Sequence, residues 1–371
     1  MNRLFRVTGA CAVLLLVVLA VAACGGGGSS SSSSEESTSA ATETETSTSE
    51  GSGEGGEIEI NVGPQTLKYP AGTKPKIAMF AGSGVVYQEV ARKAAEEQAK
   101  EYGYELTYYD SKFEATTQLQ QLQNALSGGE YNAWVLEADA GKLACSTVKQ
   151  AAEKNIAIVQ IVNFTCEQAN KPANEESWTP GTIASVGAAT TLTYYESFAK
   201  QVKEMIKTPN PVVGVVNGPP TIPTTEELQT ALEKAGIEVE DEVATAYLIP
   251  EGLKETQTML QAHPDINVII SVADDPTVGA VRAIEAAGKT GEIEVFDLGG
   301  SKAAVKLIEE GKLVMTAPYF PATTAAEGVT VLHKAFEGEP TERFYDGFAV
   351  GTVEKPFFVT KANVHEYEPE Y

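Results

Sequence analysis

The side chains of this sequence that are suited to catalysis are few and scattered. The three histidines, His263, His333 and His365, are far apart, and none has a cysteine or a second histidine nearby. Zinc sites and Ser-His-Asp catalysis therefore lack their ligands and their base. The segment Gly82-Ser83-Gly84 has neither the full pattern around a nucleophilic serine nor the GK[ST] ending of a phosphate loop. We expect no catalytic residues and no cofactor.

Asp274 and Asp275 are the remaining candidates for metal or acid–base chemistry. They are adjacent, they directly follow an apolar run, and no third carboxylate or histidine stands at ligand spacing. One of them is expected to cap the helix that begins near Thr277. We therefore interpret the pair as part of a strand end and not as a metal site.

The N-terminal segment carries an export signal. Arg3 and Arg6 precede an apolar run that is too short to span a membrane, so residues 1–23 are predicted to be a signal peptide. The run ends in LAVAA before Cys24, and this segment resembles the lipobox of bacterial lipoproteins, whose cysteine is lipidated. A plain signal peptide with an incidental cysteine is the alternative.

Two further cysteines remain in the exported part of the chain. Cys145 and Cys166 are an even pair in an oxidising compartment. We predict that they form a disulfide, and two buried free thiols are the alternative.

The segment after Cys24 is predicted to be a lipid-anchored, disordered linker over residues 24–70. Its first part consists of Gly, Ser, Thr and Glu, which cannot bury enough surface to offset the entropy of ordering. The formal net charge of −24 argues against nucleic acid and against direct binding to anionic lipid. Contact with the membrane is expected through the lipid anchor only.

The remaining 300 or so residues predict two lobes, because a single core seldom grows that large. Short apolar runs alternate with helical stretches, which is typical of parallel sheets covered by helices on both faces. The predicted strands are 76–80, 105–109, 133–136, 156–162, 212–216, 243–248, 268–272, 294–298 and 313–317. The fold class is therefore α/β, with two Rossmann-like, doubly wound parallel sheets whose strand ends face a cleft.

Several stretches together resemble the type I periplasmic solute-binding proteins of the ribose-binding kind, which serve ABC importers. The resemblance runs from about Lys76 to Thr360. It rests on KIAMFAGSGVVYQEVARKAAEEQAKEYG from Lys76, SVADDPTVGAVRAIEAAGK from Ser271, VFDLGG from Val295 and AAVKLIEEGKLVMTAPYFP from Ala303.

This resemblance implies two lobes that close on a ligand around a hinge of three crossovers, near Ile183–Ser185, Pro318–Phe320 and Phe348–Gly351. The implied N-terminal lobe is 75–183 plus 320–347. The implied C-terminal lobe is 184–319 plus 348–371, and its last residues, from Glu366, are expected to be frayed.

The resemblance also implies ligand-binding positions. Tyr87 stands where an aromatic ring packs on a sugar, and Asp274, Asp297 and Tyr319 stand where polar side chains contact hydroxyls. Carboxylates suit hydroxyls because each oxygen accepts charge-assisted hydrogen bonds. Ser83, in the first strand-to-helix turn, and Asn163, after the predicted strand 156–162, are further candidates.

The sequence departs from the resemblance at two places. Sugar binders of this kind carry Asp then Arg where Val162 and Asn163 stand, and another family arginine is missing near Thr225. The cleft is therefore expected to favour a neutral polyol-like or a cationic ligand over an acidic sugar.

The segment after Asn163 is longer than the resemblance implies, and it carries Trp178. Trp178 is a candidate for stacking on the ligand at the cleft mouth. The alternative is that Trp178 covers apolar surface on its own lobe.

The predicted function is capture of a small ligand, a sugar or polyol, and its delivery to an ABC permease by a monomeric receptor. The alternatives are a ligand-sensing receptor for a signalling kinase, a binder of an amine or nucleoside-like ligand, and an extracytoplasmic enzyme on the same scaffold.

Overall fold

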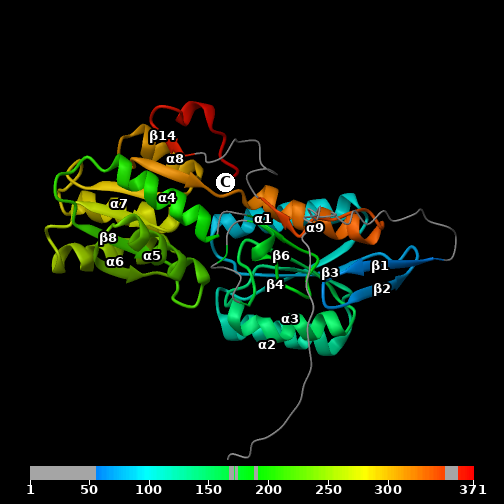
Figure 1. Ribbon diagram of the computed structural model, residues 1–371. Helices are drawn as coiled ribbons and strands as arrows, with labels where there is room; N and C mark the ends of the chain where they lie inside the picture. The colour runs from blue at the N-terminus through cyan, green and yellow to red at the C-terminus, as the bar shows by residue number, and fades with distance from the viewer. Residues whose placement is uncertain (1–55, 167–170, 172–173, 188–190, 347–357) are drawn as a thin grey trace, which may run out of the picture. The chain divides into compact units, whose positions relative to one another are not determined.

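The computed structural model describes residues 56–166, 171, 174–187, 191–346 and 358–371. The predicted signal peptide and Cys24 lie outside these residues. Within them the chain forms two six-stranded sheets and one two-stranded sheet, with helices packed on the two large sheets (Figure 1). The predicted α/β fold class is confirmed. No helix in the described part of the chain is long and apolar enough to cross a membrane.

The first large sheet is parallel throughout, with strand order β13-β7-β6-β5-β3-β4. Helices α1 and α9 pack together, as do α2 and α3, and the two pairs lie on opposite faces of the sheet (Figure 1). The elements are β3 (Lys76–Ala81), α1 (Val86–Glu101), β4 (Glu105–Asp110), α2 (Ala115–Gly128), β5 (Ala133–Leu136), α3 (Gly141–Glu153), β6 (Ala157–Ile161), η1 (Glu175–Ser177), β7 (Ala184–Val186), α9 (Pro321–Phe336) and β13 (Phe344–Tyr345).

The second large sheet has the order β14-β12-β11-β10-β8-β9 and is parallel except for the pair β12–β14. Helix α4 packs on α5, and α6 packs on α7. The elements are α4 (Leu192–Met205), β8 (Val213–Asn217), α5 (Pro223–Ala235), β9 (Val239–Ala244), α6 (Ile249–Ala262), β10 (Val268–Ser271), α7 (Asp274–Ala286), β11 (Glu294–Gly299), α8 (Lys302–Glu309), β12 (Met315–Pro318), β14 (Val359–Thr360) and η2 (Val364–Glu366).

The first lobe boundary differs from the predicted one. Strand β7 pairs in parallel with β6 in the first sheet, so residues 184–186 belong to the N-terminal lobe and not to the second. The chain leaves this lobe only before α4. The second passage lies between β12 and α9, at Tyr319 and Phe320. The third predicted crossover, Phe348–Gly351, lies outside the described residues.

The predicted linker is wrong at its C-terminal end. Residues 57–70 form an antiparallel hairpin of β1 (Glu57–Asn61) and β2 (Thr66–Pro70). Ile60, Val62, Leu67 and Tyr69 are buried against the N-terminal lobe. Apolar and polar residues alternate on both strands, and this period of two places one face on a core. The acidic tether before the hairpin has no such alternation.

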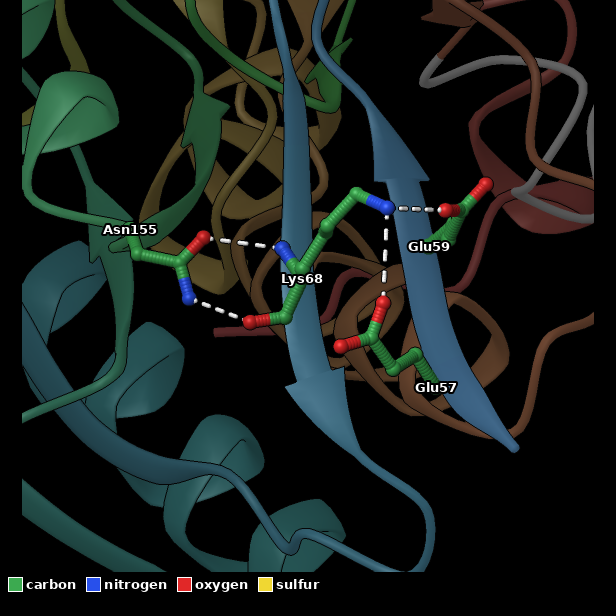
Figure 2. A network of polar contacts seen from close by, with 4 residues as sticks. All are labelled: Glu57, Glu59, Lys68 and Asn155. Carbon is green, nitrogen blue, oxygen red and sulfur yellow. Dashed lines mark hydrogen bonds and ion pairs between the residues drawn. The ribbon is translucent and has the colours of Figure 1, made fainter. Parts of the chain in front are cut away.

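Polar contacts at Lys68 hold the hairpin in place (Figure 2). The Asn155 side chain accepts from Lys68 N at 2.9 Å and donates to Lys68 O at 2.6 Å, so it pairs with the backbone as a neighbouring strand would. The Lys68 ammonium bonds Glu59 at 2.6 Å and Glu57 at 3.3 Å across the two strands. The outer edge of β2 is therefore covered at this point, which limits pairing with another chain.

One strand of the second sheet was predicted in the wrong place. The sequence indicated a strand at 243–248, but β9 spans Val239–Ala244 at the edge of the sheet. Only one face of an edge strand needs to be apolar. Strand β9 therefore contains charged residues, and its sequence does not have the continuous apolar run of a buried strand. The residues that follow it include Tyr247, which has a φ of 63°, and they lead into α6.

Helices α6 and α7 approach each other closely at Gly279 of α7. A Cβ at Gly279 would overlap Ile249 O and Leu253 N of α6, which are backbone atoms that have little room to move. Overpacking of this kind costs about 1–3 kcal/mol. We expect Gly279→Ala to lower the free energy of unfolding by about 2 kcal/mol, measured by denaturant titration.

Gly128 offers the matched control, because it ends α2 and a Cβ there meets no atom within 4 Å. Gly128→Ala should leave stability unchanged or raise it slightly. Equal effects of the two substitutions would contradict the close helix contact.

Candidate functional site

A cavity of about 470 Å³ lies where the carboxyl ends of strands from both large sheets meet. Each strand end or helix start around it contributes a few side chains, as expected for sheets that bind ligands at this edge. The walls are formed by Val85, Val86, Tyr87, Gln88, Val90, Phe113, Glu137, Val162, Asn163, Ile222, Tyr247, Val272, Ala273, Asp274, Asp275, Ser301, Lys302, Ala303, Tyr319, Glu370 and Tyr371.

The N-terminal lobe presents two buried oxygen acceptors to this cavity. Glu137 directly follows β5 and is 4 % exposed, and Gln88 of α1 donates to its Oε1 at 2.8 Å. Asn163 follows β6 and is 7 % exposed. Within the described residues, Glu137 Oε2 and Asn163 Oδ1 have no hydrogen-bond partner. Buried acceptors without donors are costly, so these atoms suit a ligand that brings N–H or O–H groups.

Burial dominates the electrostatics of Glu137. Its pKa is raised to about 8, mainly by loss of solvation; the Gln88 hydrogen bond lowers the pKa, and the charge of the nearby Asp139 raises it. Glu137 is therefore largely protonated at neutral pH in the ligand-free protein.

The C-terminal lobe presents Asp274 at the start of α7. Its Oδ1 accepts from Ser301 N at 3.1 Å, and its Oδ2 accepts from the Tyr371 hydroxyl at 2.6 Å. Burial raises its pKa to about 6, although both of these hydrogen bonds favour the ionised form. Asp275 beside it is half-buried, and burial raises its pKa as well.

Aromatic rings from several elements form another part of the wall. The Tyr87 ring of α1 lies edge-on to Tyr319, with centroids 6.2 Å apart, and edge-on to Tyr371 at 5.6 Å. The hydroxyls of Tyr319 and Tyr195 are 3.2 Å apart. Phe113 and Tyr247 form a further edge-on pair at 5.4 Å. Such faces pack well on the C–H groups of a sugar or on a cation.

The structure therefore places four predicted ligand-binding residues, Tyr87, Asn163, Asp274 and Tyr319, around one cavity. Their roles in binding remain predictions. Three other predicted residues do not line it.

Ser83 and Asp297 are directed elsewhere. The Ser83 hydroxyl donates to Asp110 Oδ2 at 2.6 Å across the end of β4. Asp297 of β11 is fully buried, and burial raises its pKa well above the usual range, with the charge of Asp274 adding to the effect. Asp297 lies within β11 and not after its end, so its side chain points into the interior between the sheet and the helices that cover it.

Trp178 packs on its own lobe, as the alternative interpretation held. Its Nε1 donates to Thr182 O at 3.1 Å, and the Arg343 guanidinium lies 4.3 Å from its ring centroid. The ring also lies against Gly63, where a Cβ would overlap it. Trp178 thus packs against the turn that joins β1 and β2 and does not line the cavity.

We expect Trp178→Ala to weaken folding and to leave ligand affinity unchanged. Truncating a fully buried Trp costs about 3–5 kcal/mol, and the half-buried Trp178 should cost about 2 kcal/mol. Denaturant unfolding tests the first part, and calorimetric titration of any bound solute tests the second. A large loss of affinity with intact stability would return Trp178 to the ligand site.

The disulfide between Cys145 and Cys166 is present, as predicted, with an S–S distance of 2.04 Å. Cys166 N also donates to Gly141 O at 2.9 Å. The bond ties the first turns of α3 to the loop after β6, three residues beyond Asn163. Neither cysteine lines the cavity.

Some residues of the cavity were missed by the sequence analysis. Glu137 directly follows β5, so the rule that sites gather after strand ends was sufficient to find it. Glu370 and Tyr371 lie in the tail that was predicted to be frayed, but Tyr371 is only 8 % exposed. No local pattern in the sequence marks this tail as part of a site.

The chemistry of the cavity is that of a hydrogen-bond acceptor surface. Among the described residues, four carboxyl groups line it, from Glu137, Asp274, Asp275 and Glu370, against the single ammonium of Lys302. No group of three potential metal ligands occurs in the described part of the chain. The arrangement is suited to a small ligand that is rich in hydrogen-bond donors.

Comparison with known proteins defines the class. The sequence profile of the periplasmic binding protein domain matches residues 77–340, and this chain therefore belongs to that family. An extracytoplasmic location follows from the family. The family match begins at β3, so the β1–β2 hairpin precedes it.

Individual relatives are similar over parts of their length. The D-ribose/D-allose-binding protein of Pseudomonas aeruginosa is 27 % identical over 146 residues, which cover 38 % of this chain and 46 % of that protein. The ribose import binding protein of Salmonella typhimurium is 34 % identical over 95 residues, covering 26 % and 32 %. The chain thus matches less than half the length of these curated relatives.

A solved structure shows the same fold over nearly its whole length. The periplasmic solute-binding protein of an ABC transporter from Actinobacillus succinogenes, with bound D-allose, aligns with a TM-score of 0.65 and 20 % identity. The alignment covers 79 % of this chain and all of that one. The predicted resemblance is confirmed for family and fold.

Proposed function

We propose that this protein is a solute receptor that captures a sugar or polyol between its two lobes and delivers it to an ABC importer. The observation that carries the proposal is the cavity at the facing strand ends, with its unpartnered acceptors Glu137 Oε2 and Asn163 Oδ1. Polyols bring several O–H donors and C–H faces, and the cavity offers acceptors and aromatic rings for both. The relatives described above, which bind ribose or allose, support the same ligand class.

The charge of the cavity favours neutral or cationic ligands over anionic ones. An anionic sugar acid would face the carboxylates of Asp274, Asp275 and Glu370, and among the described residues that line the cavity Lys302 alone supplies a counter-charge. A neutral polyol avoids this repulsion. An amine is the second candidate, because carboxylates and aromatic rings both attract a cation.

The N-terminal segment gives the receptor its place in this proposal. A lipid on Cys24 would hold the mature chain at the membrane surface, and the acidic tether would let the folded part meet solute while staying near its permease. A monomer suffices for this role, and nucleic acid has no part in it.

A thermal-shift screen tests the proposed function. The probes are D-ribose, D-allose and myo-inositol as neutral ligands, D-glucosamine as a cation and D-glucuronate as an acid. A ligand at 100 times its Kd adds about 2.7 kcal/mol to the stability of the folded state, so Tm should rise with a neutral probe. A shift with D-glucuronate that exceeds all neutral and amine shifts would contradict the proposal.

Two asparagines show whether such a shift comes from the cavity. Asn163→Ala removes a cavity acceptor and should abolish most of the shift, whereas Asn174→Ala, at an exposed site outside the cavity, should preserve it. Equal shifts in the two variants would place the ligand elsewhere.

A further inference from the structure

The C-terminal segment is fixed to the second lobe by several contacts. Strand β14 pairs with β12, and η2 follows it. The Tyr367 hydroxyl then donates to Gly300 O at 2.8 Å, and Lys302 N donates to Tyr371 O at 2.7 Å. Tyr367 and Tyr371 are 6 % and 8 % exposed. The segment is therefore anchored on the strand-to-helix loop after β11, which also forms part of the cavity wall.

The same segment reaches the N-terminal lobe through Glu370. Its carboxylate accepts from Ala322 N at 2.7 Å and from the Thr323 hydroxyl, in the first turn of α9. A carboxylate at this position satisfies N–H groups that the helix leaves unpaired and interacts favourably with the helix dipole. Residues 367–371 thus contact both lobes beside the cavity.

Tyr371 enters the cavity from this anchored segment. Its ring packs edge-on against Tyr87 of α1, with centroids 5.6 Å apart, and its hydroxyl donates to Asp274 Oδ2 at 2.6 Å. Because Ser301 N already donates to Oδ1, both oxygens of Asp274 accept hydrogen bonds from the chain itself. The phenol therefore makes, at Oδ2 of this carboxylate, a hydrogen bond of the kind that a ligand hydroxyl would make.

We propose that Tyr371 is a specificity-determining residue of the ligand cavity, which blocks Asp274 and limits the size of the ligand, so that the ligand is bound through Glu137 and Asn163. This inference rests on the proposed function, since it concerns the same cavity. A ligand that needs Asp274 must displace the phenol, and the contacts of Tyr367 and Glu370 oppose that displacement. Small donors that reach Glu137 Oε2 and Asn163 Oδ1 meet no such barrier.

The electrostatics of Asp274 agree with this arrangement. Burial raises its pKa, and the Tyr371 hydrogen bond is the first of the contacts that lower it again. The phenol therefore stabilises the ionised carboxylate in the absence of ligand.

The first experiment measures specificity with Tyr371→Ala. Calorimetric titration with D-ribose and myo-inositol gives the ratio of the Kd for D-ribose to the Kd for myo-inositol. Removal of the phenol enlarges the cavity and frees Asp274 Oδ2, so this ratio should rise at least tenfold over the wild type. A ratio within twofold of the wild type would overturn the inference.

Tyr104→Phe is the matched control, because the Tyr104 hydroxyl bonds His333 Nδ1 at 2.7 Å and lies outside the cavity. It should leave both Kd values within twofold. If the Tyr371→Ala variant binds one of the probes and the wild type binds neither, the inference is supported. The proposed ligand of the wild type is then a smaller polyol than either probe. If neither protein binds either probe, both proposals fail. Wild-type binding with an unchanged ratio rejects only the role of Tyr371.

The second experiment needs no ligand. Tyr371→Phe and Asp274→Ala each remove one partner of the hydroxyl–carboxylate contact, and Tm is measured for both variants and for their combination. The contact predicts that the double variant loses clearly less than the sum of the single losses. Strict additivity would show that Tyr371 does not bond Asp274 and would overturn the inference.

Discussion

The ligand-free protein should lose stability as the pH rises above neutrality, and Glu137→Gln should remove a large part of that loss. Burial holds the pKa of Glu137 at about 8 in the folded protein, against an ordinary value of 4.5. Between these values the folded state keeps a proton that the unfolded state has released. The proton retained by Glu137 therefore stabilises the folded state. This stabilisation is fully present below pH 4.5 and is lost as the pH rises through 8. Over the whole range this stabilisation is worth on the order of 5 kcal/mol.

Between pH 6.5 and 8, the change in stability reports mainly the titration of Glu137 and little of that of Asp139 and Asp274. The pKa values of Asp139 and Asp274 are raised to about 6, so both are largely ionised before this window begins. In the wild type we expect about 2 kcal/mol of stability to be lost across it. The fully buried Asp297 and Glu227 also have raised pKa values, and any slope that remains in the variant belongs to them.

Denaturant unfolding at several pH values measures this effect. Glu137→Gln should flatten the slope between pH 6.5 and 8, because glutamine does not titrate and still offers an oxygen to Gln88. Glu153→Gln, at the exposed end of α3, is the matched control and should keep the wild-type slope. If the slope is the same in all three proteins, Glu137 is ionised throughout and the account of its burial is wrong.

The protonated form also matters for recognition. A neutral Glu137 can donate one hydrogen bond and accept others, so it fits a sugar hydroxyl in either direction. A cationic amine would instead favour the carboxylate and release a proton on binding. Proton uptake or release during titration therefore separates the two ligand classes at this residue.

The fold was largely predictable because its strands are buried on both faces. Runs such as Ile77–Phe80 and Val268–Ile270 are apolar without interruption, which marks parallel strands under helices on both sides. The errors lie at edges. The hairpin at 57–70 and the edge strand β9 bury only one face, so their mixed composition resembled the tether or a loop.

The candidate site was only partly predictable. Strand ends identified the neighbourhoods of Asn163 and Asp274, because the carboxyl ends of parallel strands share one edge. The direction of each side chain there depends on loop geometry. Ser83 turns to Asp110, and Trp178 turns to Arg343, on contacts between residues distant in sequence. The position of Tyr371 depends on the path of the whole C-terminal segment, which no local pattern encodes.

The disulfide should contribute more to stability than to binding. It closes a loop with a sequence separation of 21 residues, and the entropy that such a link removes from the unfolded chain corresponds to about 3 kcal/mol. The double variant Cys145→Ser/Cys166→Ser should therefore unfold at a Tm lower by about 8 °C. Reduction of the wild type should produce a similar shift, and it serves as the control for damage by the serines themselves.

Ligand affinity should change little in the same variant, because the loop near Asn163 has a second support. Thr165 N donates to Gln160 Oε1 at 2.9 Å, and the Thr165 hydroxyl donates to the same oxygen at 2.8 Å. Gln160 lies in β6 and is fully buried, so it holds the start of the loop to the sheet without the disulfide. We expect the Kd of a bound solute to stay within threefold when it is measured well below the lowered Tm. A large loss of affinity with little loss of stability would mean that the disulfide, and not Gln160, positions Asn163.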